Sequence, residues 1–309
     1  MADCAVLTEP SLLAGGSLER SLPERDFIMP LGGHMSPGDY KRFTNLVYEK
    51  CGIQLNASKQ LMVETRLRKR LKATGAKTYR EYWECLNGNR GGEEELVYFI
   101  DAITTNKTDF FREPAHFDYL VKQVLPSLGP RLKAMARPLR VWSAGCSTGK
   151  EAYTLAMVLQ DCRRSGLIGE FAIFGSDICT DVLAHAKRAI YSADDIRPIP
   201  ESLRKKYLLK SRGEPANFRI VPELRSAASF ARLNFMDERY SVDQPFDIVF
   251  CRNVIIYFDR PTQEHVINRL AACLVSGGYF FTGHSETLNG LATPLTSAAP
   301  TIYRKAIRK

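Results

Sequence analysis

Two carboxylates and a glycine-containing turn are the residues of this sequence best suited to holding a small ligand. The turn, SAGCSTG at residues 143–149, follows a short apolar run and is separated from Glu151 by one lysine. Gly145 lets the backbone pass close to a ligand, and a helix after the turn offers unpaired N–H groups. Asp177 ends a second apolar run, where a carboxylate can accept hydrogen bonds from both hydroxyls of a ribose. Two plainer interpretations stay open: a tight strand-to-helix turn, and an aspartate that caps a helix.

The turn matches neither of the common glycine-rich phosphate-binding motifs. The dinucleotide fingerprint G-x-G-x-x-G is absent, and the P-loop pattern fails at its first and last positions, which are Ala144 and Glu151. Without the final hydroxyl the loop lacks a magnesium ligand, and the Glu151 carboxylate would repel phosphate. A ligand without phosphate and with positive charge fits better. S-adenosylmethionine carries a sulfonium, an ammonium group and two ribose hydroxyls, and it is the expected cofactor.

A regular alternation of strands and helices begins after Pro138 and would bring the turn and Asp177 to one edge of a sheet. Such an alternation predicts an α/β fold with a parallel sheet covered on both faces, whose ligands bind at the carboxyl ends of the strands. The expected strands are residues 139–143, 171–177, 229–234, 246–251, 278–283 and 301–305. The expected helices are residues 149–164, 179–189 and 261–275.

The α/β domain is expected to occupy residues 106–309, with other units before and inside it. Proline-rich residues at about 196–228 interrupt the alternation and predict an inserted small subdomain. Residues 35–105 predict a small all-helical domain, because a Ser-Pro helix start and helical periodicity recur between glycine-rich breaks. Residues 1–34 show no sustained period and are expected to be a disordered leader. The helices expected after the Ser36 start are residues 58–74, 78–87 and 93–105.

The amino-acid composition excludes some classes of protein but does not identify the binding partner. The 43 Lys and Arg residues against 34 Asp and Glu give a formal net charge of +9, which attracts acidic protein, nucleic acid or anionic lipid. The 8 cysteines show no C-x-x-C or zinc-type spacing, so no metal site is expected. The cysteines are expected to be reduced thiols of a cytoplasmic protein. No stretch of about 20 residues stays apolar, so no membrane insertion is expected.

Four ordered motifs resemble the chemotaxis receptor methyltransferases, the CheR family. The motifs are TNKTDFFRE at 105–113, VWSA and STG at 141–144 and 147–149, FCRNVIIYF at 250–258, and GHSE at 283–286. The resemblance runs from about Ser36 to the C-terminus. It implies a Rossmann-like class I methyltransferase sheet, preceded by a small helical domain. It also implies transfer of a methyl group from S-adenosylmethionine to receptor glutamates, which leaves S-adenosylhomocysteine.

Carried over by position, the resemblance implies the lining of a cofactor pocket. With Gly145 of the turn, the implied residues are Asn106, Thr108, Arg112, Glu151, Asp177, Asn234, Phe235, Arg252 and Asn253. Arg112 and Tyr257 would lie nearest the transferred methyl, as the catalytic pair. A glutamate acceptor is ionised at pH 7 and needs no general base, so Arg112 would orient its carboxylate. The plainer interpretations are an interdomain ion pair for Arg112 and a packed core tyrosine for Tyr257.

The helix expected at 58–74 has one apolar and one basic face. Val63, Leu67 and Leu71 share the first face at 100° per residue. The basic residues of the helix that spread over the other side are Arg66, Arg68, Lys69 and Lys72. A solvated face is the plainer interpretation. The resemblance instead implies that these cations bind the acidic helices of the receptor cytoplasmic domain.

The expected partner is therefore the cytoplasmic helical domain of methyl-accepting chemotaxis receptors. The enzyme itself is expected to be monomeric and cytoplasmic. Two alternatives stay open. The net charge also permits a nucleic-acid methyltransferase, but the Asn/Asp-Pro-Pro-aromatic motif of amino-methylating DNA enzymes is absent at Arg252–Ile255. The other alternative is a non-catalytic receptor-binding or cofactor-sensing module, against which the presence of Arg112, Glu151, Asp177 and Tyr257 argues.

Overall fold

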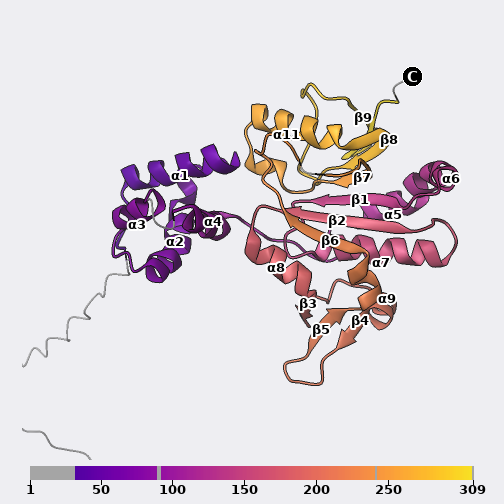
Figure 1. Cartoon of the computed structure of the whole chain (residues 1–309), viewed down its shortest axis with the longest axis horizontal. Helices are drawn as coiled ribbons and strands as arrows, with labels where there is room; N and C mark the ends of the chain where they lie inside the picture. The colour runs from indigo at the N-terminus through magenta and orange to yellow at the C-terminus, as the bar shows by residue number, and fades with distance from the viewer. Residues whose placement is uncertain (1–31, 89–91, 241, 308–309) are drawn as a thin grey trace, which may run out of the picture.

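The computed structural model describes residues 32–88, 92–240 and 242–307, so nearly all of the expected leader lies outside the described residues. Figure 1 shows a group of helices, in indigo, beside a larger α/β body. The helices of this group are α1 (Pro37–Cys51), α2 (Gln60–Thr74), α3 (Tyr79–Leu86) and α4 (Gly92–Ile103), with a 3-10 turn at Ala57–Lys59. Ser36 caps α1 by accepting a hydrogen bond from Asp39 N, and Pro37 is the first helical residue.

The helical domain has a core of its own. Val63, Leu67 and Leu71 of α2 are fully buried, as the helical periodicity predicted. They pack in one cluster with Phe43 of α1 and Phe99 of α4. Met35 is also buried, and its N–H donates to a Glu64 carboxylate oxygen at 3.0 Å, so the ordered packing begins before α1.

The α/β body contains a seven-stranded sheet in the order β6-β2-β1-β7-β8-β10-β9. Its strands are β1 (Leu139–Ala144), β2 (Phe171–Asp177), β6 (Ala228–Arg232), β7 (Phe246–Phe250), β8 (Leu274–Phe281), β9 (Leu295–Ala299) and β10 (Ile302–Lys305). The pairs from β6 to β8 are parallel, whereas β10 runs antiparallel to β8 and β9. The predicted mostly parallel α/β class is confirmed. β9 was not predicted, and it extends the edge beyond β10.

Helices cover both faces of the sheet. They are α5 (Ala115–Tyr119), a π-helical turn (Leu120–Val124), α6 (Leu125–Met135), α7 (Lys150–Arg164), α8 (Thr180–Arg188) and α11 (Arg260–Ala272). Alternate residues of β1 serve the two faces: Leu139 and Val141 join the cluster that contains α6 and α7, and Trp142 joins the one that contains α11. The helical stretch from 115 to 135 was missed, because Pro126, Gly129 and Pro130 read as helix breakers.

The chain between α8 and β6 forms a separate small unit, seen below the main sheet in Figure 1. It holds β3 (Ile190–Ser192), α9 (Glu201–Tyr207), β4 (Leu208–Lys210), β5 (Asn217–Ile220) and α10 (Pro222–Ser226). Its three strands pair antiparallel in the order β3-β5-β4. The unit therefore begins at β3, ahead of the expected residue 196. Among the described residues, every helix is too short or too polar to cross a membrane.

Candidate cofactor site

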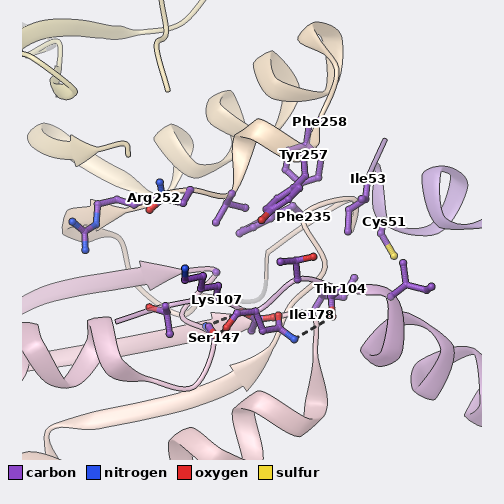
Figure 2. A pocket seen from close by; sticks show the side chains of 18 of the residues that line it. Cys51, Ile53, Thr104, Lys107, Ser147, Ile178, Phe235, Arg252, Tyr257 and Phe258 are labelled. Carbon is purple, nitrogen blue, oxygen red and sulfur yellow. Dashed lines mark hydrogen bonds between the residues drawn. The ribbon is translucent and has the colours of Figure 1, made fainter. Parts of the chain in front are cut away.

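A cavity of about 240 Å³ lies at the carboxyl ends of β1, β2 and β7, where the helical domain meets the sheet. Every residue expected to hold the cofactor lines it: Asn106, Thr108, Arg112, Gly145, Glu151, Asp177, Asn234, Phe235, Arg252 and Asn253. Tyr257 lines it too. Figure 2 shows Tyr257, Phe258 and Phe235 on one side of the opening, with Lys107, Ser147 and Ile178 on the other. The two flanks thus come from loops far apart in the sequence.

The turn after β1 places only one of its two glycines at the cavity. Gly145 has φ +79°, and a Cβ there would lie 2.5 Å from Val254 Cγ2. Gly149 has φ +82° but does not line the cavity, and a Cβ there would lie 2.8 Å from Ala186 Cβ. Gly145 therefore keeps the floor of the pocket open, whereas Gly149 permits α7 and α8 to pack closely.

Asp177, at the end of β2, is held rigidly by backbone groups. Its carboxylate is 8% exposed and accepts hydrogen bonds from Ser147 N at 2.8 Å and Cys179 N at 3.0 Å. Burial raises the pKa of Asp177 above the usual aspartate value, and these N–H groups oppose that rise. Each oxygen receives one bond and keeps acceptor capacity toward the cavity. The carboxylate therefore contributes to loop structure and can still bind ligand hydroxyls.

Glu151 does not present a free negative charge to the cavity. Its Oε2 accepts from Arg252 Nε at 2.7 Å and its Oε1 from Ser143 Oγ at 2.6 Å. The sequence placed the Glu151 carboxylate beside the turn but gave no sign of its partner, Arg252. The ion pair forms because β7, which leads to Arg252, lies next to β1 in the sheet. Strand order cannot be read from the local sequence.

The loop after β7 is shaped by a carboxylate from the loop after β8. Glu286 is buried and accepts from the N–H groups of Asn253, Val254, Ile256 and Gly283 at 2.6–3.3 Å. Asn253 has a left-handed backbone, with φ 59°. Glu286 thereby fixes the loop that carries the pocket residues from Arg252 to Phe258. The GHSE motif pointed to Glu286 as part of the resemblance, but only the fold reveals what it binds.

The segment between the two domains forms another wall. Thr104 to Thr108 line the cavity, and the carbonyl of Asn106 accepts from Ser147 Oγ at 2.7 Å. Lys150 lies beneath this segment, where it donates to Thr108 O at 3.3 Å and pairs with Asp195 at 2.6 Å. Lys150 therefore connects the cofactor wall to the small three-stranded unit.

The helical domain closes the remaining side. Gln54 N donates to Tyr257 O at 2.8 Å, and Asn234 Nδ2 donates to Lys50 O at 2.6 Å. Lys59 and Met62, at the start of α2, also line the cavity. Helical periodicity could not predict that these residues border the cavity, because it assigns residues to faces of one helix and not to contacts with another domain.

Two of the four basic α2 residues do not form an open surface. Arg66 is half-buried and donates to the carbonyls of Ile103 and Thr104, the latter at 3.0 Å. Arg68 is partly buried and pairs with Glu64 at 3.5 Å. Arg66 is thus held by the end of α4, and Arg68 by a carboxylate one turn earlier on its own helix, so neither is a freely solvated cation. Receptor binding by the four basic residues stays a prediction. Lys69 and Lys72 are exposed, and none of the four lines the cavity.

A mostly parallel sheet with a glycine turn after one strand, an acid at the end of the next and a pocket at these strand ends belongs to the class of α/β proteins that bind a nucleoside-containing cofactor. Two family descriptions match the chain: "CheR methyltransferase, SAM binding domain" over residues 106–303 and "CheR methyltransferase, all-alpha domain" over residues 38–104. The chain belongs to the CheR methyltransferase family. It is an S-adenosylmethionine-dependent methyltransferase of chemotaxis.

Chemotaxis protein methyltransferases align with most of the chain. The chemotaxis protein methyltransferase of Borreliella burgdorferi is 36% identical and aligns over 88% of this chain and 95% of its own length. That of Escherichia coli is 35% identical, over 87% and 91%. Chemotaxis protein methyltransferase 2 of Pseudomonas aeruginosa is 36% identical, over 88% and 95%. These alignments include both domains that line the cavity.

Proposed function

We propose that this enzyme methylates glutamate side chains on the cytoplasmic helical domain of chemotaxis receptors, and that it acts in the cytoplasm as a monomer without nucleic acid. The observation that carries the proposal is the charge of the cavity lining. Lys59, Lys107 and Arg112 all line the cavity, and among the described residues no carboxylate forms an ion pair with them. Three unpaired cations favour an anionic acceptor group.

The residues of the pocket fit S-adenosylmethionine, which supplies an electrophilic methyl group on a sulfonium. Asp177 keeps acceptor capacity for ribose hydroxyls. The other residues proposed to bind the cofactor all line the cavity. Phe235 and Ile178 offer apolar contact, and the side chains of Asn106, Asn234 and Asn253 offer amide groups. The chain's own task is to align donor and acceptor and to exclude water.

The acceptor carboxylate enters on the side of Arg112 and Tyr257. It is ionised at neutral pH, so no side chain has to remove a proton from it. Arg112 Nη1 makes only a long contact, 3.3 Å to Lys107 O, which leaves guanidinium donors for a carboxylate. Tyr257 has no hydrogen-bond partner for its hydroxyl among the described residues. Both side chains are therefore free to contact the reacting groups.

The exposed residues near the cavity suit an amphipathic helix as substrate. Leu61 on α2 is 69% exposed and Ile256 beside Tyr257 is 47% exposed, one from each domain. Lys69 and Lys72 continue the basic surface along α2. A helix that carries both apolar residues and glutamates matches this combination of an apolar contact and a positive field.

Incubation with methyl-tritiated cofactor and a receptor cytoplasmic fragment tests the proposal. Label should appear on the receptor fragment and be released as methanol in mild base, because carboxyl methyl esters are base-labile. A fragment with its acceptor glutamates replaced by glutamine is the matched control and should stay unlabelled. Base-stable label, or label in added DNA or RNA, would show a different acceptor and overturn the proposal.

A further inference from the structure

We propose that His116, which does not line the cavity, is a positioning residue that orients Arg252 through a hydrogen bond at Nδ1. The proposal rests on the proposed function and on the cofactor-binding role expected of Arg252, which lines the cavity. His116 is 2% exposed and lies on α5, a helix that the sequence did not reveal. It thus adds a functional residue outside the pocket.

The Arg252 guanidinium is fixed at several points. Besides the bond from Nε to Glu151, its Nη1 lies 2.8 Å from Arg112 O, 3.1 Å from His116 Nδ1 and 3.4 Å from Glu113 Oε2, so its two hydrogens are shared among three neighbours. The guanidinium carbon also lies 5.3 Å from the ring centre of Phe117. His116 is the one neutral acceptor side chain in this set, so it adds a directional bond without adding charge.

The contacts of His116 fit one tautomer. The proposed role requires the tautomer with its proton on Nε2, so that Nδ1, which lies 3.1 Å from Arg252 Nη1 and 3.3 Å from Glu113 Oε2, accepts from the guanidinium. Nε2–H then donates to Thr301 Oγ1 at 2.8 Å, and the threonine hydroxyl donates to Pro300 O at 2.6 Å. The chain of bonds is fully satisfied with a neutral ring. Burial and the Arg252 charge lower the pKa of His116 to about 4, which keeps the ring neutral.

A metal site is the competing interpretation of the same cluster. Glu113, His116 and His284 hold ligand atoms within 4.8 Å of one another. However, both ring nitrogens of His116 already have hydrogen-bond partners, and the Arg252 guanidinium would lie directly beside a bound cation. His284 is exposed and contacts Glu113 through its backbone N–H. The geometry therefore favours orientation of Arg252 over coordination of zinc.

A matched pair of substitutions tests the positioning role. In His116→Asn the amide oxygen falls near the position of Nδ1, whereas in His116→Gln the amide reaches toward Thr301 and leaves Arg252 without this acceptor. Calorimetric titration with S-adenosylhomocysteine should show a Kd raised roughly tenfold to a hundredfold in His116→Gln and a smaller rise in His116→Asn. Thermal melting of each variant controls for folding. Equal Kd values in the two variants would overturn the proposal.

Two further measurements separate the possible failures. Arg252→Gln should raise the Kd by itself, and His116→Gln should add little in that background, because His116 acts through Arg252. If Arg252→Gln binds S-adenosylhomocysteine with the parent Kd, Arg252 does not bind the cofactor, and the positioning role of His116 is then wrong as well. If His116→Gln has the parent Kd while Arg252→Gln does not, the positioning role of His116 is wrong and the cofactor-binding role of Arg252 stands. Zinc titration of the parent and of His284→Ala completes the test, since tight, His284-dependent zinc binding would favour the metal site.

Discussion

At the scale of single residues, charge pairing divides the ionisable groups of the pocket. Glu151 and Arg252 neutralise each other, and Asp177 is held by N–H groups. Lys59 and Lys107, by contrast, have no carboxylate partner among the described residues. In the proposed function, Glu151, Arg252 and Asp177 contact the cofactor, and the unpaired charges of Lys59 and Lys107 attract the acceptor carboxylate. Different substitutions should affect cofactor binding and acceptor binding separately.

Asp177→Asn should weaken cofactor binding while the protein still folds. The amide has one acceptor oxygen, and its NH₂ would face a backbone N–H of Ser147 or Cys179. Loss of a charge-assisted hydrogen bond costs about 1.5–3 kcal/mol, so the Kd for S-adenosylhomocysteine should rise tenfold or more in calorimetric titration. Asp181→Asn, an exposed position on α8, is the control. Parent-like affinity of Asp177→Asn would move the ribose site elsewhere.

Tyr257→Phe and Arg112→Ala should reduce kcat more than they change cofactor affinity. Both side chains lie where the acceptor is expected, and misplacement by about 1 Å can cost around a hundredfold in rate. Single-turnover methylation at saturating cofactor and receptor measures the effect. Tyr98→Phe, exposed on α4, serves as the control. If both variants transfer methyl at the parent rate, alignment must come from backbone groups.

His116 should contribute a pH-dependent part of stability. Its folded pKa of about 4 lies below the unfolded value of 6.5, so between these values the unfolded chain binds a proton that the folded chain lacks. The free energy of unfolding therefore falls as pH falls from 6.5 to 4, by at most about 3 kcal/mol. The charged and titratable groups that face the ring are Arg252, Glu113 and His284.

Urea unfolding across this pH range, compared between the parent and His116→Asn, isolates the contribution. The variant should lose stability less steeply on acidification, because it has no ring to protonate in the unfolded state. Parallel curves for the two proteins would show that the ring of His116 is protonated in the folded state as readily as in the unfolded chain.

At the scale of elements, α2 serves two purposes along its length. Met62 in its first turn borders the cavity, as does Lys59 just before the helix, and Arg66 donates to the carbonyls at the end of α4. Only the later cations, Lys69 and Lys72, are exposed. One helix thus positions the interdomain segment and presents charge to solvent.

Lys69→Ala with Lys72→Ala should raise the KM for receptor several-fold and leave the cofactor Kd unchanged. Exposed cations act through a screened field, so the difference from the parent should shrink as salt is raised. Steady-state kinetics at low and high ionic strength measure this. A double variant at Lys122 and Lys187, exposed on other helices, makes the same charge change as a control. An equal KM effect in the control would mean that only net charge matters.

At the scale of the whole molecule, the cavity is completed by contacts between the two domains. Gln54 bonds to Tyr257 and Asn234 to Lys50. On another side, Asp101 at the end of α4 accepts from the N–H of Thr180, the first residue of α8, at 2.9 Å. A ligand in the cavity touches residues of both domains and should stabilise them together.

Saturating S-adenosylhomocysteine should slow amide hydrogen exchange in both α2 and α8. At a hundredfold excess over Kd the folded state gains about 2.7 kcal/mol. Exchange measured by mass spectrometry on peptides from the two helices tests this. In Asp101→Ala, which removes the contact with Thr180, protection of α2 should weaken while protection of α8 persists. Protection of α8 alone in the parent would show that the helical domain does not sense the ligand.

The sequence by itself determined the local elements and the chemistry available at their ends. Helical periodicity placed Leu67 in a core, the Ser-Pro pair marked the start of α1, and the apolar run to Asp177 matched β2 at both ends. These features depend on neighbours within a few residues. The rule that ligands bind at strand ends predicted that the turn at residues 143–149 and Asp177 meet. The family resemblance implied the other cofactor residues, and the structure brings all of them to one cavity.

Only the tertiary structure decided how the charges pair and which residues support the site. Arg252 neutralises Glu151 because β7 lies beside β1, and Arg66 turns inward because the end of α4 offers it carbonyl groups. His116 meets Arg252 from α5, a helix of five residues that is too short to show a helical period in the sequence. Each of these contacts joins residues distant in sequence. The free energy of such a pair depends on burial and direction in space, and no local pattern of residues encodes either of them.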